Sequence, residues 1–341
     1  MTRHDRHGVA VVTGGTAGVG RATVRELAGQ GWDVGILARG QAGLDGAAAD
    51  VAAAGRSACP VQADVADPAA VDAAADQIAA RLGPIGLWVN VAFAGYLEFF
   101  RDTTLEEFKR VTEVTYYGQV HGTRAALRQM RPADRGVIVN VGSAMAHRGI
   151  PLQAAYCGAK HAVKGFTESV MTELAHEKSR IKLCTVQLPG LNTPQFNWNL
   201  TKMPGHPMPV PPVFQPELAA RAIAFLADHP RRNMWVGVPT AYTILGERLA
   251  PKLLDIYLGR TGVKSQQTDE QLPRWDENLS IAQDSDEDRG AHGAFGAQAH
   301  PRDPVLWCSM HRRALLAGLA AVLLGGAAAA TAGRYGPPAR G

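Results

Sequence analysis

The residues Val9-Ala-Val-Val-Thr13 and the turn that follows them, Gly14-Gly-Thr-Ala-Gly-Val-Gly20, decide the fold. The first five form a continuous apolar run, which is typical of a strand covered on both faces of a parallel sheet. The glycine-rich turn leads into a helical stretch that ends near Gln30. In this order the elements let backbone N–H groups approach a pyrophosphate at the N-terminus of the helix. The stretch therefore predicts a nucleotide-binding unit, with a glycine-rich turn that binds nothing as the alternative.

The pattern continues outward from this stretch. Residues 8 to about 260 alternate short β-branched runs with Ala-rich helical stretches, which is typical of an α/β fold. The overall balance of 35 Lys and Arg against 31 Asp and Glu, with the basic residues scattered, does not indicate a nucleic-acid partner. Four cysteines in 341 residues exclude a disulfide scaffold. They form no C-x-x-C pair and have no His at metal-ligand spacing, so we expect a reduced cytosolic protein without a metal site.

A second stretch, Gly136-Val-Ile-Val-Asn-Val-Gly-Ser143, predicts a buried strand that ends at Ser143. Open parallel sheets bind their ligands beyond the carboxyl ends of the strands. Tyr156 and Lys160 follow four residues apart, so on a helix both can point into one cleft. A phenol has a pKa of ~10, which a nearby ammonium lowers. A surface Tyr–Lys pair without chemical function is the alternative, and the position of Ser143 weighs against it.

The spacing T-G-x-x-x-G-x-G of Thr13, Gly14, Gly18 and Gly20, joined to these three polar residues, resembles the short-chain dehydrogenase/reductase family in its compact form. The extended, epimerase-like members space their glycines differently. The resemblance covers residues 8 to about 250. It implies an α/β fold with a Rossmann-like, doubly wound parallel sheet of about seven strands and helices on both faces, in which Val9–Thr13 and Val137–Val141 are inner strands.

The resemblance also assigns chemical functions. Tyr156 is the general acid in reduction and the general base in oxidation, Ser143 binds the substrate oxygen, and Lys160 holds the nicotinamide ribose and tunes Tyr156. Thr115 stands where the family commonly has an Asn that holds a water in the proton relay behind Lys160. Thr has a shorter reach, so we expect a displaced water and retained activity.

The end of the second expected strand, at Ala38 and Arg39, bears on the cofactor. An acid there would bind the adenosine ribose hydroxyls and repel a 2′-phosphate. Ala38 removes that acid, and Arg39 offers donors suited to a phosphate, so NADP(H) is preferred over NAD(H). An ordinary surface Arg is the alternative.

The family's cofactor contacts carry over to further positions. Asp64 stands where the family contacts the adenine edge, although a turn or helix-capping Asp is a rival interpretation. Val91 and Phe93 depart from the family's Asn-Asn-Ala-Gly. The predicted cofactor contacts are Thr13, Gly14, Gly18, Val19, Gly20, Arg39, Asp64, Val65, Asn90, Ala92, Tyr156, Lys160, Pro189, Gly190 and Thr193.

Residues 195–216 are rich in proline and aromatic side chains. Loops of this length are often lids. We interpret the segment as an apolar cover over the substrate, formed by Phe196, Trp198, Met203, Met208 and Phe214, with a surface loop packed on the body as the alternative.

Residues 265–341 change composition twice. We divide the chain into a NAD(P)-binding catalytic domain (1–260), an acidic, largely irregular linker (261–311) and a hydrophobic segment (312–341). Residues 269–288 hold eight acids and one base, which indicates a solvated arm. Residues 314–333 carry no charge and are long enough to cross a bilayer of ~30 Å. A tail anchor that leaves the catalytic domain in the cytoplasm is the hypothesis; a helix packed on a partner and a flexible tail stay open.

These patterns together predict an NADP(H)-dependent oxidoreductase that interconverts a ketone or aldehyde and an alcohol on a small apolar substrate. The resemblance implies a homo-oligomer, a dimer or a tetramer. A catalytically weak NADP(H)-binding protein that acts as a membrane-tethered interaction module is the second hypothesis, motivated by Thr115, Val91, Phe93 and the tail.

Overall fold

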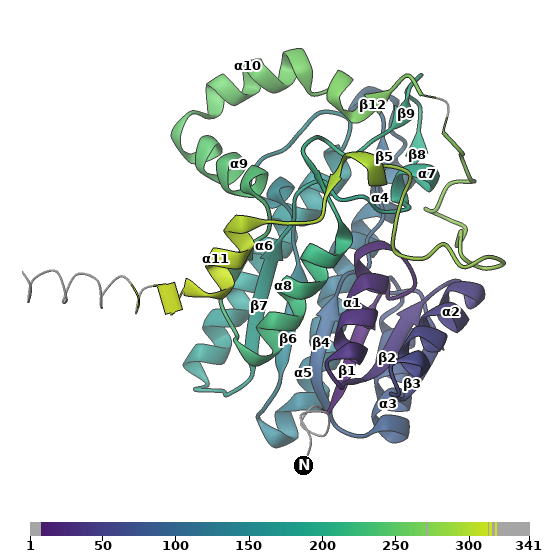
Figure 1. Cartoon of the computed structure of the whole chain (residues 1–341), viewed down its shortest axis with the longest axis vertical. Coiled ribbons are helices and arrows are strands. Elements are labelled where there is room, and N and C mark those ends of the chain that lie inside the picture. Colours follow the sequence, from purple (N-terminus) through teal and green to yellow (C-terminus); the bar gives the residue numbers. More distant parts are fainter. Residues whose placement is uncertain (1–7, 271, 313, 316–317, 319–341) are drawn as a thin grey trace, which may run out of the picture.

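A seven-stranded parallel sheet forms the centre of the protein (Figure 1). The computed structural model describes residues 8–270, 272–312, 314–315 and 318. The strand order is β11-β7-β6-β4-β1-β2-β3, and all neighbours in it run parallel. The predicted doubly wound, Rossmann-like sheet is thereby confirmed, with β1 and β6 as inner strands. The strands are β1 (Val9–Thr13), β2 (Asp33–Ala38), β3 (Ala58–Gln62), β4 (Ile85–Asn90), β6 (Val137–Val141), β7 (Lys182–Gln187) and β11 (Asn233–Trp235).

Helices cover both faces of the sheet, and each face has its own apolar cluster. Every residue of β1 and β6 is buried, which agrees with the mostly apolar sequences of both strands. One face holds α1 (Gly18–Gly29), α2 (Gln41–Ala53) and α8 (Pro216–Asp228). The other holds α3 (Pro68–Leu82), α4 (Leu105–Thr112), α5 (Gly118–Met130) and α6 (Ala154–His176).

Short local signals set the helix boundaries. The Asp67 carboxylate accepts hydrogen bonds from the backbone N–H groups of Ala69 and Ala70, so it caps α3. Thr104 and Glu107 form a reciprocal capping box at the start of α4. A π-helical turn, Glu113–Tyr117, joins α4 to α5.

Beyond the sheet, short strand pairs tie the expected lid to the rest of the chain. The lid contains α7 (Gln195–Trp198), β8 (Leu200–Thr201), β9 (His206–Pro207) and β10 (Val213–Phe214). β8 pairs with β5 (Tyr96–Leu97), β9 with β12 (Gln267–Thr268), and β10 with β13 (Ala299–His300). Two further helices, α9 (Val238–Leu249) and α10 (Pro251–Thr261), stand out from the body at the top of Figure 1.

The acidic segment differs from the expected solvated arm. Figure 1 shows it running from α10 back over the body to α11 (Pro304–Met310). Leu279, Ala291 and Phe295 are buried, and Arg21 of α1 binds Asp288 through two hydrogen bonds. Asp288 thus has a cationic partner on the body, and apolar residues of the segment pack inward. The high net charge of the segment indicates solvation, although single apolar residues within it are buried.

Within the described ranges, no helix is long and apolar enough to cross a membrane. Apart from residues 314, 315 and 318, the predicted membrane segment 314–333 lies outside the described residues.

Candidate active site

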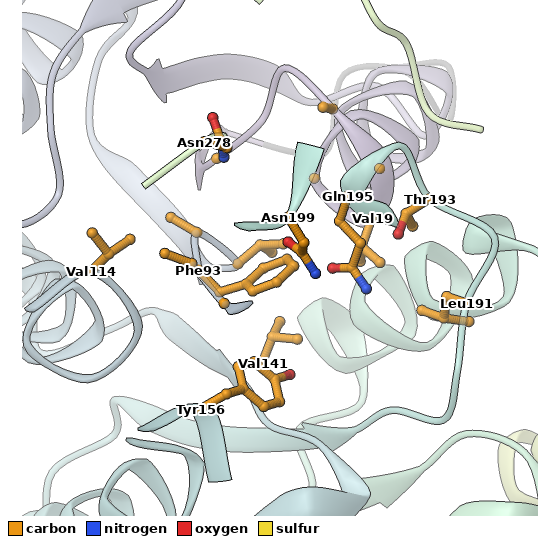
Figure 2. Close-up of a pocket in the computed structure, with 18 of the residues that line it drawn as sticks. Val19, Phe93, Val114, Val141, Tyr156, Leu191, Thr193, Gln195, Asn199 and Asn278 are labelled. Atoms are coloured by element: carbon orange, nitrogen blue, oxygen red, sulfur yellow. The ribbon is translucent and has the colours of Figure 1, made fainter. Parts of the chain in front are cut away.

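A cavity of about 230 Å³ opens at the carboxyl ends of the parallel strands (Figure 2). It brings together most of the residues singled out in the sequence. Thr13, Asn90 and Thr115 do not line it. The predicted residues that do are Gly14, Gly18, Val19, Gly20, Arg39, Asp64, Val65, Ala92, Ser143, Tyr156, Lys160, Pro189, Gly190 and Thr193.

The glycine turn needs its glycines for space as well as conformation. Gly14 has a φ of +68°, and a Cβ added there would lie 2.8 Å from the Cα of Ala92. A Cβ at Gly20 would lie 2.0 Å from the carbonyl oxygen of Gly14. Ala17, the N-cap of α1, has no side chain that could bond to the first turn. The turn is therefore a backbone cradle that suits a pyrophosphate, although the N–H of Gly18 already donates to the carbonyl oxygen of Gly290 at 3.0 Å.

Thr13 and Asn90 lie behind the cavity wall. The Thr13 hydroxyl accepts hydrogen bonds from the N–H groups of Val91 (3.1 Å) and Ala92 (3.3 Å). The fully buried Asn90 amide donates to the Asn140 side chain at 2.8 Å. Both residues therefore fix the position of the loop after β4, and their direct contact with the cofactor stays a prediction.

Thr115 also holds this loop. Its hydroxyl accepts from the N–H of Ala94 and donates to the carbonyl of Ala94, each at 2.9 Å. Lys160 instead donates from Nζ to the carbonyl oxygen of Val141 at 2.7 Å. The hydroxyl of Thr115 thus accepts and donates within the loop, and the relay from Thr115 through a water to Lys160 stays a prediction.

Asp64, which lines the cavity together with Arg39, is held by two donors. Its carboxylate accepts from the N–H of Ala66 (2.9 Å) and from the guanidinium of Arg110. Burial raises the pKa of Asp64, but these two hydrogen bonds outweigh it, so the pKa lies below its usual value. The hydrogen bond from Ala66, two residues further on, is the contact expected of a turn Asp.

Ser143, Tyr156 and Lys160 meet on one side of the cavity. Ser143 follows β6, where the N–H of Met145 donates to its hydroxyl at 3.2 Å. It also forms a hydrogen bond with the Tyr156 phenol. The ammonium of Lys160 lies 5.6 Å from the centre of the Tyr156 ring. The Phe93 ring meets the same ring edge-on at 5.8 Å.

Burial shifts both titratable groups toward their neutral forms. It raises the pKa of Tyr156, although the hydrogen bond to Ser143 works in the opposite direction. Burial alone lowers the pKa of Lys160 to about 7. A phenol that keeps its proton in this way can donate it to a neighbouring oxygen.

The lid contributes part of its apolar side chains to the cavity. Phe196, Trp198 and Met208 line it, as expected of a cover. Met203 and Phe214 do not line it; Phe214 packs in the core cluster beside α8. The apolar lining next to Tyr156 indicates that this end of the cavity suits an apolar ligand.

The sequence analysis missed several lining residues. Phe93 was visible only as a departure from the family pattern, and Gln153, Gln195 and Asn199 carried no signal. The acidic segment also contributes to the cavity lining, which its composition does not predict. The residues are Asn278, Leu279 and Asp284. Figure 2 shows Asn278 on the side of the cavity opposite Tyr156.

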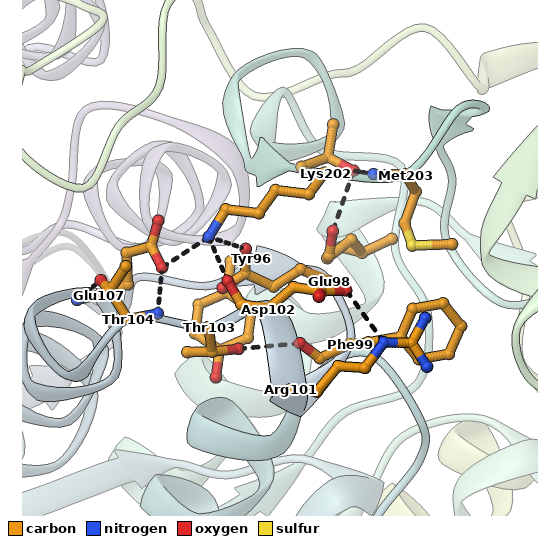
Figure 3. A network of polar contacts seen from close by, with 12 residues as sticks. Tyr96, Glu98, Phe99, Arg101, Asp102, Thr103, Thr104, Glu107, Lys202 and Met203 are labelled. Atoms are coloured by element: carbon orange, nitrogen blue, oxygen red, sulfur yellow. Dashed lines mark hydrogen bonds and ion pairs between the residues drawn. The ribbon is translucent and has the colours of Figure 1, made fainter.

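An ion network fastens the lid next to the cavity (Figure 3). The Lys202 ammonium lies 2.7 Å from the carboxylate of Glu98 and 2.8 Å from that of Glu107, and donates to the carbonyl of Asp102 at 2.7 Å. Glu98 is fully buried, whereas Lys202 is 35% exposed. A buried carboxylate needs such a cation.

Replacing Lys202 with Met is expected to lower the free energy of unfolding by about 2 kcal/mol, because it leaves the buried Glu98 without a cation. Urea denaturation measures this. Lys109→Met is the matched control, because its partner Glu113 and Lys109 itself are exposed, and it should change stability by less than about 0.5 kcal/mol. Adding Glu98→Gln to Lys202→Met should restore part of the loss. Equal effects of the two single substitutions would contradict the argument.

The sequence and the fold are similar to those of known proteins. The family model described as short chain dehydrogenase matches residues 8–203. The uncharacterized oxidoreductase YxnA of Bacillus subtilis (strain 168) is 32% identical over 292 residues, 83% of this chain and 81% of that protein. The L-2,3-butanediol dehydrogenase of Corynebacterium glutamicum is 31% identical over 204 residues, 59% of this chain and 79% of that protein. A solved short-chain dehydrogenase from Streptomyces avermitilis has a TM-score of 0.63 at 25% identity, and the match covers 76% of this chain and 98% of that chain.

Proposed function

The chain belongs to the short-chain dehydrogenase family of oxidoreductases, and we propose that it interconverts an apolar ketone or aldehyde and the corresponding alcohol with NADP(H). The observation that carries this proposal is the meeting of Ser143, Tyr156 and Lys160 around one cavity. The cavity also contains the glycine cradle. Its fit to a pyrophosphate supports dinucleotide binding, since a Cβ at Gly20 would close it.

In the reduction, Tyr156 donates its phenolic proton to the carbonyl oxygen of the substrate, and Ser143 donates a hydrogen bond to the same oxygen. The dinucleotide, when bound, supplies the hydride. Lys160 would hold the ribose hydroxyls next to the nicotinamide, and in its protonated form it favours the phenolate that remains on Tyr156. In the oxidation, Tyr156 takes the proton back.

The lining near Tyr156 supports an apolar substrate. Phe93 meets the Tyr156 ring edge-on, and Phe196, Trp198 and Met208 line the same cavity. Pockets of this kind bind by apolar contact and use a few polar groups for orientation. Ser143 and Tyr156 are those polar groups in this proposal.

The test is turnover by the purified full chain with NADPH or NADH against a panel of ketones and aldehydes that increase in apolar size. We expect oxidation of NADPH with the apolar members. Dinucleotide binding without turnover on any carbonyl would favour the second hypothesis, a catalytically weak interaction protein.

Arg39 supports the use of NADP(H) and provides a separate prediction. Its guanidinium lines the cavity at the end of β2, where Ala38 offers no acid. Arg39→Ala is expected to weaken NADPH binding about tenfold by removing a charge-assisted hydrogen bond, and to leave NADH within about threefold. Fluorescence titration measures both. The exposed Arg101, changed to Ala, is the control. Equal loss for both cofactors would sink this interpretation of Arg39.

A further inference from the structure

The acidic segment builds one wall of the cavity at the loop after β2. The N-cap of α2, Gly40, has no side chain to bond to the first turn of the helix. The segment supplies the acceptors instead: the N–H of Gly43 donates to the carbonyl of Asp284 at 2.9 Å, and the N–H of Ala42 to that of Ser285 at 3.1 Å. Backbone contacts thus fix residues 284–285 against the start of α2.

The Asp284 side chain fills the space that two glycines leave. A Cβ added at Gly40 would lie 2.0 Å from its Oδ1, and one at Gly43 would lie 2.4 Å from its Oδ2. Asp284 is 8% exposed and lines the cavity. Among the described residues we find no hydrogen bond or ion pair to this carboxylate. Because the Asp284 oxygens have no donor among the described residues and are not among the buried unpaired atoms, they keep access to the cavity and can accept hydrogen bonds from a ligand there.

Arg39 competes for the same region. Two of its nitrogens donate to the segment, Nη2 to the carbonyl of Asn278 at 2.6 Å and Nη1 to that of Leu279 at 3.2 Å. Burial and the neighbouring Arg110 lower the pKa of Arg39, and the charge of Asp284 opposes that shift. A carboxylate and a guanidinium therefore face the same end of the cavity.

We propose that Asp284 determines cofactor specificity. Its carboxylate replaces the acid missing at Ala38, accepts hydrogen bonds from the adenosine ribose hydroxyls, and repels a 2′-phosphate. Arg39 attracts that phosphate, so the two side chains act in opposite directions on the choice between NAD(H) and NADP(H). This proposal rests on the proposed dinucleotide function and deepens it.

The chemistry follows from charge and donors. The hydroxyls of an adenosine ribose are donors, and an acid at this position of the fold binds them. A 2′-phosphate carries negative charge and no donor when ionised. At a few ångströms from a carboxylate, the repulsion amounts to a change of tenfold or more in affinity at an effective dielectric constant of about 20.

The experiment compares Asp284→Asn with the unmodified full chain by fluorescence titration of NADH and NADPH. ADP and 2′,5′-ADP serve as fragment probes that lack the nicotinamide. We expect the affinity for NADPH relative to NADH to rise about tenfold, and the affinity for 2′,5′-ADP relative to ADP to rise equally. Asp286→Asn is the matched control. It removes the same charge from an exposed side chain that lies two residues further along the chain. It should leave both ratios within about twofold.

Three outcomes would overturn the proposal: unchanged ratios in Asp284→Asn, an equal fall for both cofactors, or the same shift in Asp286→Asn. Asp284→Ser provides a second variant if Asp284→Asn does not fold, and the same shift is required of it. Absence of any dinucleotide binding by the unmodified chain would overturn the proposed function and this inference together. Binding of both cofactors with insensitive ratios would overturn the inference alone.

Discussion

Replacing Tyr156 with Phe is expected to lower kcat about a thousandfold, within the range that general acid–base catalysis contributes. Phe keeps the ring, and with it the edge-on contact to Phe93 and the packing near Lys160. It removes only the hydroxyl that donates the proton and meets Ser143. The affinity for NADPH should stay within about threefold, because the cradle and the loop after β2 are untouched.

Steady-state turnover and NADPH titration on the same preparation check this result. Tyr117→Phe is the matched control, since Tyr117 loses the same atom from a side chain that is 48% exposed and absent from the cavity lining. Its kcat should match that of the unmodified chain. A Tyr156→Phe variant that keeps kcat within tenfold would show that another group delivers the proton, and the catalytic proposal would be wrong.

Replacing Gly20 with Ala should abolish dinucleotide binding at any concentration that a titration can reach, a loss of about a hundredfold or more. The new Cβ would meet the carbonyl oxygen of Gly14, which belongs to the backbone of the turn and cannot rotate away. The turn would have to open, and the N–H groups that form the cradle would move with it. The free energy of unfolding should fall by about 1–3 kcal/mol, as in other overpacked sites.

Gly29→Ala is the matched control on the same helix. A Cβ at Gly29 would meet nothing within 4 Å. Because Ala favours helix over Gly by about 1 kcal/mol, this variant should be equally stable or slightly more stable, and its dinucleotide affinity should not change. Fluorescence titration and urea denaturation of both variants measure the contrast. Equal behaviour of Gly20→Ala and Gly29→Ala would show that the cradle does not depend on close backbone approach.

The sequence predicts the sheet and the residues whose positions depend on local spacing. The run Val9–Thr13 and the glycines after it determine a strand, a turn and a helix within one short stretch, and the structure contains each of them. Tyr156 and Lys160 share a helix face because a helix repeats every 3.6 residues. Such features follow from neighbours along the chain.

The direction of a polar side chain at a strand end depends on register with other strands. Asn90 stands directly opposite Asn140 in the pairing of β4 with β6, so its amide bonds to Asn140 and is turned away from the cavity. The register of two parallel strands far apart in sequence is not visible in either strand alone. The family pattern locates Asn90 correctly along the chain, but its bonding emerges only from the assembled sheet.

The packing of the acidic segment also depends on residues far apart in the sequence. Its composition indicates solvation. No local pattern predicts that Leu279 is buried or that Asp284 packs against Gly40 and Gly43 at the start of α2. The space at Gly40 and the side chain that fills it are separated by most of the chain. Contacts of this kind depend on shape complementarity, which cannot be predicted from amino-acid composition.

The pairing of β10 with β13 has a consequence for biosynthesis. β10 ends at Phe214, but its partner strand ends at His300, so a growing chain exposes the lid long before the strand that completes it leaves the ribosome. The central sheet needs nothing beyond Trp235 and can form first. The pairing of β10 can therefore form only after the rest of the lid has been synthesised, and premature termination before residue 299 leaves the lid paired with β5 and β12 but without β13.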